Sequence, residues 1–499
     1  MISRKMRSAA AIILAVTAMA GCSDPYSTDD DDDGGGALTV TIVQANPTVA
    51  AGSQITLQAT LANDTTAGPN RGVTWSSSNE AVLTIDAATG VATGVAAGTS
   101  KVIATSKHRP AVKDSVTVTV TAVIPTLATI PLLGRGLVPE RYTAEVAAAN
   151  GFAYTTTWGG RTYNGTFNRG NVVKVWNVAG NVPVLVDSLK IPDVGTTSDV
   201  QITPDGSMMV VSTEGLSTGS IVMYSLADPA HPAFIARFQN SNTLRGVHTV
   251  KLSVINGTLY GFLQIDPTAA LMIVDMSNPL AVQQVFYQVM GAPYVHDVFV
   301  RDGFLFTALW NDGMSIFDVG GGTSGGSPSN PVFLGNVDTP TGQIHNIWWL
   351  HDPETGAKQY ALLGEEGPGG VPVASSGDIH VIDVSNMAAP VEVATYSVTG
   401  AGTHNFFVDE ESMVLYAAYY NAGVRAIDVS GNMNTCDAEQ RVVSGPYAGK
   451  CDLRLMGREL AAGLTSGSYV WGVTMQGDRL YASDMNAGLA VLDISALKR

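Results

Sequence analysis

The stretch Leu489-Ala-Val-Leu-Asp-Ile-Ser495 is one copy of a phrase that recurs along most of the chain and decides its fold. The copies are short, rich in Val and Ile and free of proline, and most of them follow a glycine. That composition is typical of a buried β-strand that begins at a turn. Copies spaced by roughly 40 to 60 residues predict small sheets arranged radially, one for each copy. The seven copies, of which the first two are looser, cover 172–178, 220–226, 271–277, 314–319, 379–385, 424–430 and 489–495.

Each repeated unit can be divided into four strands, of which the phrase is the third. The last unit stops at 495–499, directly after its third strand, and therefore lacks a fourth. A spare segment ahead of the first unit, Thr126–Gly134, resembles the outer strands of other units, such as 331–335. We expect this segment to complete the last sheet, because that pairing covers an open edge and closes the ring.

An aspartate recurs near the end of the phrase. Its regular recurrence argues against a catalytic role and favours a carboxylate that accepts backbone hydrogen bonds at the following turn. The positions are Asp275, Asp318, Asp383, Asp428 and Asp493.

The region before the repeats, residues 38–122, alternates apolar and polar residues, as strands of a two-sheet sandwich do. Its motifs are Val73-Thr-Trp-Ser-Ser-Ser-Asn-Glu80, Leu83-Thr-Ile-Asp86 and Gly90-Val-Ala-Thr-Gly94. They resemble the group 2 bacterial immunoglobulin-like domain, which implies a spacer or adhesion module at a cell surface. We expect Trp75 to be a core residue rather than a platform for sugar stacking.

The repeated units over 123–499 resemble the LVIVD-repeat family of bacterial and archaeal surface proteins, a resemblance that implies a β-propeller. The expected fold is therefore all-β: an immunoglobulin-like β-sandwich followed by a seven-bladed β-propeller.

Residues 1–21 have the pattern of an export signal, with basic residues first and an apolar run over 9–20 after them. The sequence Met19-Ala-Gly-Cys22 resembles a bacterial lipobox, which implies cleavage before Cys22 and lipid attachment to its thiol. The alternative is an ordinary secretory cleavage with Cys22 unmodified. Residues 22–37, which include five consecutive aspartates, predict an acidic, glycine-rich tether. We expect an exported protein anchored by lipid at the bacterial outer membrane or cell surface.

The two other cysteines, Cys436 and Cys451, lie fifteen residues apart in an insert over 431–467. Export into an oxidising compartment favours a disulfide between them. A metal-binding pair is less favoured because no histidine lies between them. We expect the insert to form an added outer strand or a loop on the rim.

Four consecutive units carry a histidine at the start of the innermost strand: His248, His296, His345 and His404. The other three units place Ala144, Ser198 and Trp471 there. Equivalent positions of a propeller surround its central channel, so the four imidazoles should meet on one side of it. The loops on that face add polar residues, namely Glu214, Asp266, Asn311, Asp312, Glu365, Glu366, Asn421 and Asp484.

Imidazole nitrogens with nearby carboxylates suit a divalent transition metal such as Zn, Cu, Fe or Mn. The predicted metal residues are the four histidines together with Glu365 and Glu366. The alternative is that the histidines are structural and bond within their blades. The histidines off this register, which we expect in loops or at the surface, are His108, His231, His351 and His380.

The formal charge of −16 argues against binding to nucleic acid or anionic headgroups. We expect a monomer that presents its propeller to a protein or a small-molecule ligand, without catalysis. The alternative is a metal-dependent oxidase or hydrolase with Glu365 or Glu366 as general base or additional ligand. The sequence contains no nucleophile elbow, phosphate-binding loop or zinc-protease helix, so it does not decide between binding and catalysis.

Overall fold

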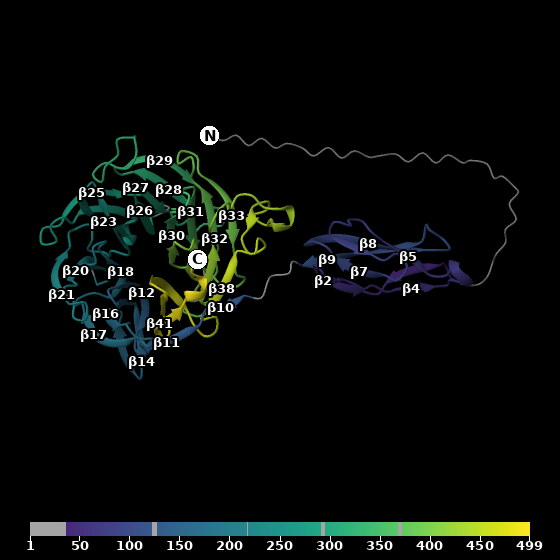
Figure 1. Ribbon diagram of the computed structural model, residues 1–499, viewed down its shortest axis with the longest axis horizontal. Coiled ribbons are helices and arrows are strands. Elements are labelled where there is room, and N and C mark those ends of the chain that lie inside the picture. The colour runs from purple at the N-terminus through teal and green to yellow at the C-terminus, as the bar shows by residue number, and fades with distance from the viewer. Residues whose placement is uncertain (1–35, 122–126, 217, 291–294, 368–371) are drawn as a thin grey trace, which may run out of the picture. The chain divides into compact units, whose positions relative to one another are not determined.

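The computed structural model describes residues 36–121, 127–216, 218–290, 295–367 and 372–499 (Figure 1). The chain divides into two compact units, and both are built from strands. The expected export signal, Cys22 and nearly all of the expected tether lie outside the described residues. Among the described residues, no helix has the length and apolar character needed to cross a membrane.

The first unit is the predicted β-sandwich. Its core includes Trp75 and Leu83, which are 5% and 0% exposed, so Trp75 is a core residue as predicted. Strands such as β1 alternate between exposed and buried residues because one face of each sheet meets the core. The strands are β1 (Thr39–Ile42), β2 (Thr48–Ala50), β3 (Gln54–Thr56), β4 (Ala59–Ala62), β5 (Val73–Ser77), β6 (Leu83–Ile85), β7 (Val91–Gly94), β8 (Gly98–Ser106) and β9 (Lys113–Thr121), with the short helix η1 (Gly68–Asn70).

The second unit contains seven sheets around a centre, each with four antiparallel strands (Figure 1). The first four, from the innermost strand outward, are β12 (Tyr142–Ala149), β13 (Phe152–Trp158), β16 (Val172–Asn177) and β17 (Val184–Lys190); β18 (Thr196–Ile202), β19 (Met208–Glu214), β20 (Ser220–Ser225) and β21 (Ala233–Phe238); β22 (Val250–Ile255), β23 (Thr258–Ile265), β24 (Ala270–Asp275) and β25 (Gln283–Val289); and β26 (Asp297–Arg301), β27 (Phe304–Ala308), β28 (Met314–Asp318) and β29 (Val332–Val337).

The last three sheets follow the same order. They are β30 (Ile344–Trp349), β31 (Tyr360–Glu365), β32 (Ile379–Asp383) and β33 (Val391–Tyr396); β34 (Phe406–Asp409), β35 (Val414–Ala418), β36 (Val424–Asp428) and β38 (Glu459–Gly463); and β39 (Val470–Gln476), β40 (Arg479–Asp484), β41 (Gly488–Asp493) and β11 (Leu132–Leu137). Smaller elements are the hairpin β14 (Gly160–Tyr163) and β15 (Thr166–Arg169), and the short helices η2 (Asp266–Thr268), η3 (Ala438–Gln440) and η4 (Ser495–Leu497).

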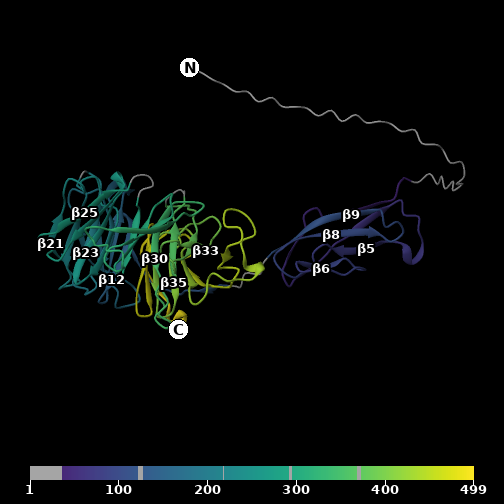
Figure 2. The same ribbon diagram turned by 90° about the horizontal axis from the view of Figure 1, so that it is seen from above.

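The innermost strands pack against one another in chain order, and β12 packs against both β18 and β39. The unit is a seven-bladed β-propeller, seen from a second direction in Figure 2. The spare N-terminal segment serves two blades. Strand β11 pairs with β41 and completes the seventh sheet, which confirms the predicted pairing; of the predicted segment 126–134, only residues 132–134 belong to this strand. The residues just before it form β10 (Ala128–Thr129), which pairs in parallel with β38 of the sixth sheet.

The repeated phrase forms the third strand of every blade. In β41 all residues but the last are buried, because neighbouring sheets cover both of its faces. The aspartate that ends the phrase accepts a backbone hydrogen bond from the turn, which confirms its predicted role. Asp275 and Asp493, for example, accept the amides of Ser277 and Ser495 at 2.8 and 2.9 Å.

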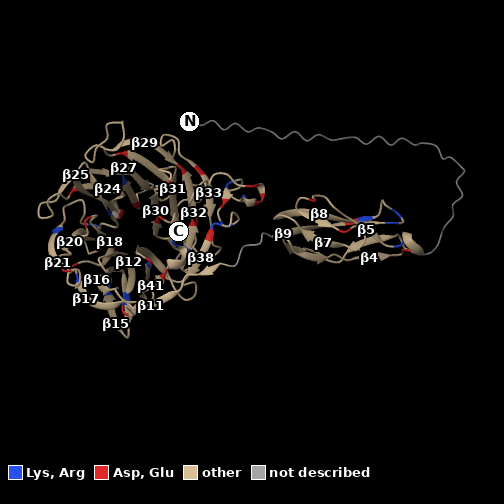
Figure 3. Ribbon diagram, in the orientation of Figure 1, with Lys and Arg blue, Asp and Glu red and all other residues tan. Residues whose placement is uncertain are grey.

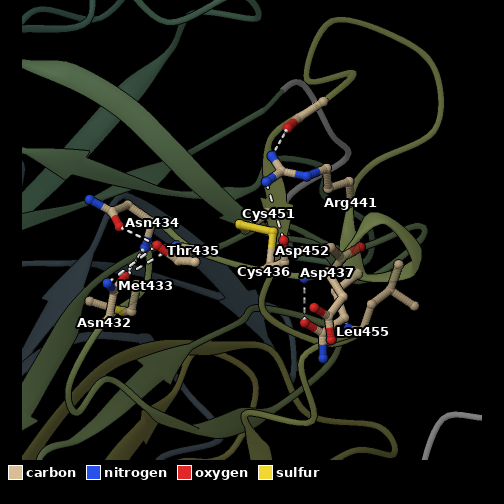
Figure 4. The surroundings of a disulfide bond; sticks show 12 residues. Asn432, Met433, Asn434, Thr435, Cys436, Asp437, Arg441, Cys451, Asp452 and Leu455 are labelled. Atoms are coloured by element: carbon tan, nitrogen blue, oxygen red, sulfur yellow. Dashed lines mark hydrogen bonds between the residues drawn. A yellow bond between two sulfur atoms is a disulfide. The ribbon is translucent and has the colours of Figure 1, made fainter.

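The insert after the sixth phrase adds strands to the outer edges of two blades. Its strand β37 (Cys451–Asp452) pairs in parallel with β33 as a fifth strand, and β38 then supplies the fourth strand of the sixth blade. The structure links Cys436 and Cys451 by a disulfide, which Figure 4 shows beside Asp437 and Asp452. The disulfide thereby fastens the start of the insert to β37.

Candidate metal centre and channel

Each innermost strand begins with a bulge, and the predicted histidines lie at these bulges. In the third blade, the amide of His248 donates to the carbonyl of Gln264, whose own amide donates to the carbonyl of Thr249. Two residues of the inner strand therefore oppose one residue of its neighbour. A β-bulge re-aims side chains in this way, so two successive residues can face the channel. The register shifts at the starts of β12, β18, β30 and β39 are of the same kind.

The structure brings the four register histidines together in one arc. Ring centroids lie 4.6 Å apart for His248 and His296, 4.2 Å for His296 and His345, and 3.9 Å for His345 and His404. Trp471, at the equivalent position of the seventh blade, continues the arc 4.2 Å from His404. The arc is buried: His296, His345 and His404 are 2 to 4% exposed.

Carboxylates reach the arc from loops between second and third strands. The Nδ1 atom of His248 lies 2.9 Å from Glu214 and 3.6 Å from Asp266. The Nε2 atom of His345 lies 3.6 Å from Glu366. Two groups within the described residues have one potential ligand atom from each member, all within 4.8 Å of one another. They are His248, Asp266 and His296, and His296, His345 and Glu366.

The imidazoles do not share one protonation state. Burial lowers the pKa of His248, but the charges of Glu214 and Asp266 outweigh it and raise the value to about 10. Burial, reinforced by neighbouring imidazoles, holds the pKa of His296 and His345 well below the ordinary value. The pKa of His404 is likewise well below 6.5, chiefly because of burial. His296, His345 and His404 are therefore neutral near pH 7, which is the form that binds metal ions.

Glu365 does not join this arc, so the structure corrects its predicted place in the metal site. Successive residues of a strand point to opposite faces, and Glu365 therefore points away from the side that Glu366 serves. Its carboxylate lies 3.5 Å from Nε2 of His380. Glu366 instead accepts a hydrogen bond from the Tyr420 hydroxyl, on the side of His345.

His380 was expected in a loop or at the surface, and that prediction was wrong. It lies on β32, is 0% exposed, and has Glu392 2.7 Å from Nδ1. Burial lowers the pKa of His380, but hydrogen bonds to Glu365 and Glu392 raise it to about 9. His351, His108 and His231 all lie outside the strands, as predicted; His351 is partly buried, and His108 and His231 are exposed.

Asp484 also lies outside the arc: it pairs with Arg135 at 2.8 Å within the seventh blade. Asn421 is held by Ser375, whose hydroxyl donates to its Oδ1 at 2.7 Å. Trp310, by contrast, stacks on His296 with 4.8 Å between ring centroids. The loops on this face thus contribute Glu214, Asp266, Glu366 and Trp310 to the cluster.

A second tier of polar residues, which the sequence reasoning missed, lies directly after the histidine register. Charged residues are sparse on the ribbon (Figure 3), yet Glu145, Asp199 and Asp297 all line the channel. Burial raises the pKa of Asp297 to about 7 and also raises the pKa of Asp199. Burial and the two neighbouring aspartates raise the pKa of Glu145 well above its usual range. Adjacent polar residues at the start of an otherwise apolar strand, Ser198-Asp199 and His296-Asp297, were the signal that could have found two members of this tier; Glu145, between Ala144 and Val146, has no such signal.

A cavity of about 280 Å³ connects the two tiers. His248, His345 and His404 line it at the first tier, and the second-tier carboxyl groups line it further along the channel. The arrangement therefore combines buried neutral imidazoles, at least two adjacent carboxylates and a space that a small molecule could enter.

Comparison with known families agrees with both units. Residues 38–120 match the bacterial Ig-like domain (group 2), and residues 292–339, 372–398 and 467–497 match the LVIVD repeat. No curated protein matches the chain. The chain thus carries a group 2 bacterial Ig-like domain and LVIVD repeats, a β-rich combination of the interaction or surface type.

Proposed function

We propose that the protein is an exported surface protein whose propeller holds a divalent transition metal at the imidazole arc, as a binding centre for a protein or small-molecule ligand. The single observation that carries the metal is the group His296, His345 and Glu366, whose ligand atoms lie within 4.8 Å of one another. His248 and Asp266 extend this group on one side, sharing His296.

The chemistry of the donors fits such an ion. Neutral imidazole nitrogen and carboxylate oxygen together suit Zn, Cu, Fe or Mn better than Ca or Mg, which prefer oxygen alone. Glu366 is in turn bonded by Tyr420, the kind of outer contact that orients a metal ligand.

Elemental analysis of the purified full chain tests the proposal. The protein is stripped with a chelator, dialysed against Zn²⁺, Cu²⁺ or Mn²⁺, and washed free of loosely held ions. We expect about one retained ion per chain with at least one of the metals, and loss of that ion in the double variant His296→Ala, His345→Ala. Because this variant removes two buried rings, Glu366→Gln serves as a milder second variant.

The exposed His231 provides the matched control. Its side chain is 63% exposed and contacts only Asp187 among the interactions described for it. His231→Ala should retain the ion. A wild type that retains no metal, or a double variant that retains as much as the wild type, contradicts the proposal.

The surface location rests on the sequence of the N-terminal residues. Cleavage before Cys22 would leave its thiol for lipid attachment, and the tether and the Ig-like domain would separate the propeller from the membrane. Fractionation of cells that express the full chain tests this expectation. Cys22→Ser should move the protein from the membrane fraction to the soluble exported fraction; unchanged membrane association would contradict the anchor.

A metal-dependent oxidase or hydrolase is the second candidate function. It is favoured by the cavity, because three of the four imidazoles line a space of about 280 Å³ that a substrate could share with the ion. In this role Glu366, whose pKa burial raises, would act as general base or additional ligand. Turnover of a small-ester or phenol panel that requires the ion, and disappears in His345→Ala, would favour the enzyme over the binding protein.

A further inference from the structure

The channel contains an excess of acidic groups that the metal proposal does not use. Glu145 and Asp199 are 8% and 7% exposed, and both line the cavity together with Asp297. Two cations face them from the described wall, Lys251 and His248, and His248 is already paired with Glu214 at 2.9 Å. Buried carboxyl groups need partners, so three of them around one space favour an occupant with positive charge.

Part of this acidic set is already engaged by the protein. Asp199 accepts the amides of Val200 and Val250 at 2.7 and 3.0 Å, which fixes its carboxylate at the wall. The side-chain amide of Asn405 donates to Glu145. These bonds position the carboxyl groups, but they do not supply a full countercharge.

A residue of the cavity wall also has a buried nitrogen that lacks a partner. His345 is 2% exposed and lines the cavity, and its Nδ1 atom has no hydrogen-bond partner among the described residues. This observation is independent of the carboxyl groups and points to an occupant of the same space, because buried polar atoms in native structures are seldom left unpaired.

A bare metal ion does not fit the second tier. The groups of potential ligands within 4.8 Å of one another, as far as the chain is described, include neither Glu145, Asp199 nor Asp297. The carboxyl groups therefore surround a volume larger than one ion. Further along the cavity wall, Trp348 and Phe407 pack with ring centroids 5.5 Å apart. Aromatic faces accept both apolar groups and cations.

We propose that this cavity binds a small organic ammonium compound. Its ammonium group lies among Glu145, Asp199 and Asp297, and its apolar body lies against Trp348 and Phe407. This site lies at the second tier, whereas the proposed metal centre lies at the first tier. A metal-free protein should therefore still bind the ammonium compound.

Calorimetric titration of the metal-free full chain tests this inference with matched probes. 2-Phenylethylammonium and n-butylammonium are compared with 2-phenylethanol and 1-butanol, which have similar shapes and no charge. We expect each ammonium probe to bind at least about tenfold more tightly than its alcohol, as one favourable charge interaction would produce. Absence of binding by both ammonium probes, or equal binding by the alcohols, overturns the proposal.

Three substitutions separate a charge effect from a folding defect. Glu145→Gln and Asp199→Asn should each weaken 2-phenylethylammonium about tenfold. Lys251→Met should tighten it about threefold, because it removes a like charge from the wall; a merely damaged cavity would bind more weakly. The exposed Glu354 is the control, and Glu354→Gln should bind as the wild type does. Weaker binding by Lys251→Met, or no effect of either acidic substitution, also overturns the proposal.

Metal retention measured on the same samples keeps the two proposals distinguishable. A wild type that binds the ammonium probes but retains no metal supports this cavity and contradicts the metal centre. A wild type that retains metal but binds neither ammonium probe supports the metal centre and contradicts the proposal for this cavity.

Discussion

The fifth blade contains two buried histidines with opposite chemistry. His345 on β30 is 2% exposed and has a pKa well below the ordinary value, because burial and the neighbouring imidazoles disfavour its charge. His380 on β32 is 0% exposed, yet its pKa is raised to about 9 by hydrogen bonds to Glu365 and Glu392 that overcome burial. Similar burial thus gives a neutral imidazole at the channel and a cation inside the sheet. The nearest charges decide which role a buried histidine takes.

Consecutive glutamates make this difference possible. Glu365 lies 3.5 Å from His380, and Glu366 lies 3.6 Å from His345, because neighbouring residues of an extended chain point to opposite faces. His380 has a second carboxylate, Glu392, so each of its ring nitrogens lies within ion-pair distance of a carboxylate of the blade. His345 has one, and retains an unpaired Nδ1. The comparison therefore favours a structural role for His380 and agrees with the ligand-binding role proposed for His345.

Removal of the His380 charge should have the largest effect on stability. His380→Gln leaves two buried carboxylates without their cation, and we expect a loss of about 3 to 5 kcal/mol in the free energy of unfolding. Urea unfolding of the full chain measures it. The exposed pair of His231 and Asp187 is the control, since His231→Gln should cost less than about 1 kcal/mol. Equal losses for the two variants would refute the structural role of His380.

The disulfide should have the next largest effect, and it should act on the His380 side alone. The insert that it fastens places Tyr447 against His380, with 5.5 Å between ring centroids. Closure of a loop of this length, 15 residues apart, corresponds to about 3 kcal/mol. We expect Cys436→Ser, Cys451→Ser to lose about that much stability in urea and to retain the metal. Loss of the ion in this variant would show that the two regions are not independent.

The metal should stabilise the chain through His345 and not through His380. At a free concentration 100 times the Kd, binding to the folded state alone adds about 2.7 kcal/mol. We expect this gain, measured by thermal unfolding with and without Zn²⁺, in the wild type and in His380→Gln. His345→Ala should show no gain. If His345→Ala gained as much stability from Zn²⁺ as the wild type does, the ion would bind at a site that does not include His345.

The two histidines should also have opposite pH dependence, with slopes of at most about 1.4 kcal/mol per pH unit each. The folded pKa of His380 is raised, so its stabilising contribution is complete below pH 6.5 and is lost as pH rises through about 9. The folded pKa of His345 is lowered, so stability falls as pH falls below 6.5, where the unfolded state takes up the proton. Unfolding curves of metal-free wild type and each variant between pH 5 and 9.5 test both signs. Identical pH dependence in His380→Gln and the wild type would contradict the assignment.

The sequence predicted most of the fold because both units repeat simple patterns. Alternation indicated the sandwich, and the recurring phrase indicated seven blades and the pairing of β11 with β41. The sequence did not predict that β10 would pair with β38 of the sixth blade, because a strand of two residues has no recognisable pattern.

The sequence also predicted the imidazole arc, because equivalent positions of a repeat must meet at the centre. It failed where burial depends on tertiary contacts. His380 lies within the repeated phrase and not at the position of the four channel histidines. Nothing in its neighbours along the chain indicates that Glu365 and Glu392 will lie against it. The second tier was missed because strict alternation would have turned Glu145 and Asp199 away from the channel; the bulges reverse this expectation.

The divided attachment of β10 and β11 has a mechanical consequence. Any force transmitted along the chain from the Ig-like domain enters the propeller at β10, which is bonded to the sixth blade, and passes to β11, which is bonded to the seventh. The force therefore acts first on the sixth blade and then on the seventh. The short parallel pairing of Ala128 and Thr129 with β38 would break first under force. The longer pairing of Leu132–Leu137 with β41 would still hold the propeller closed.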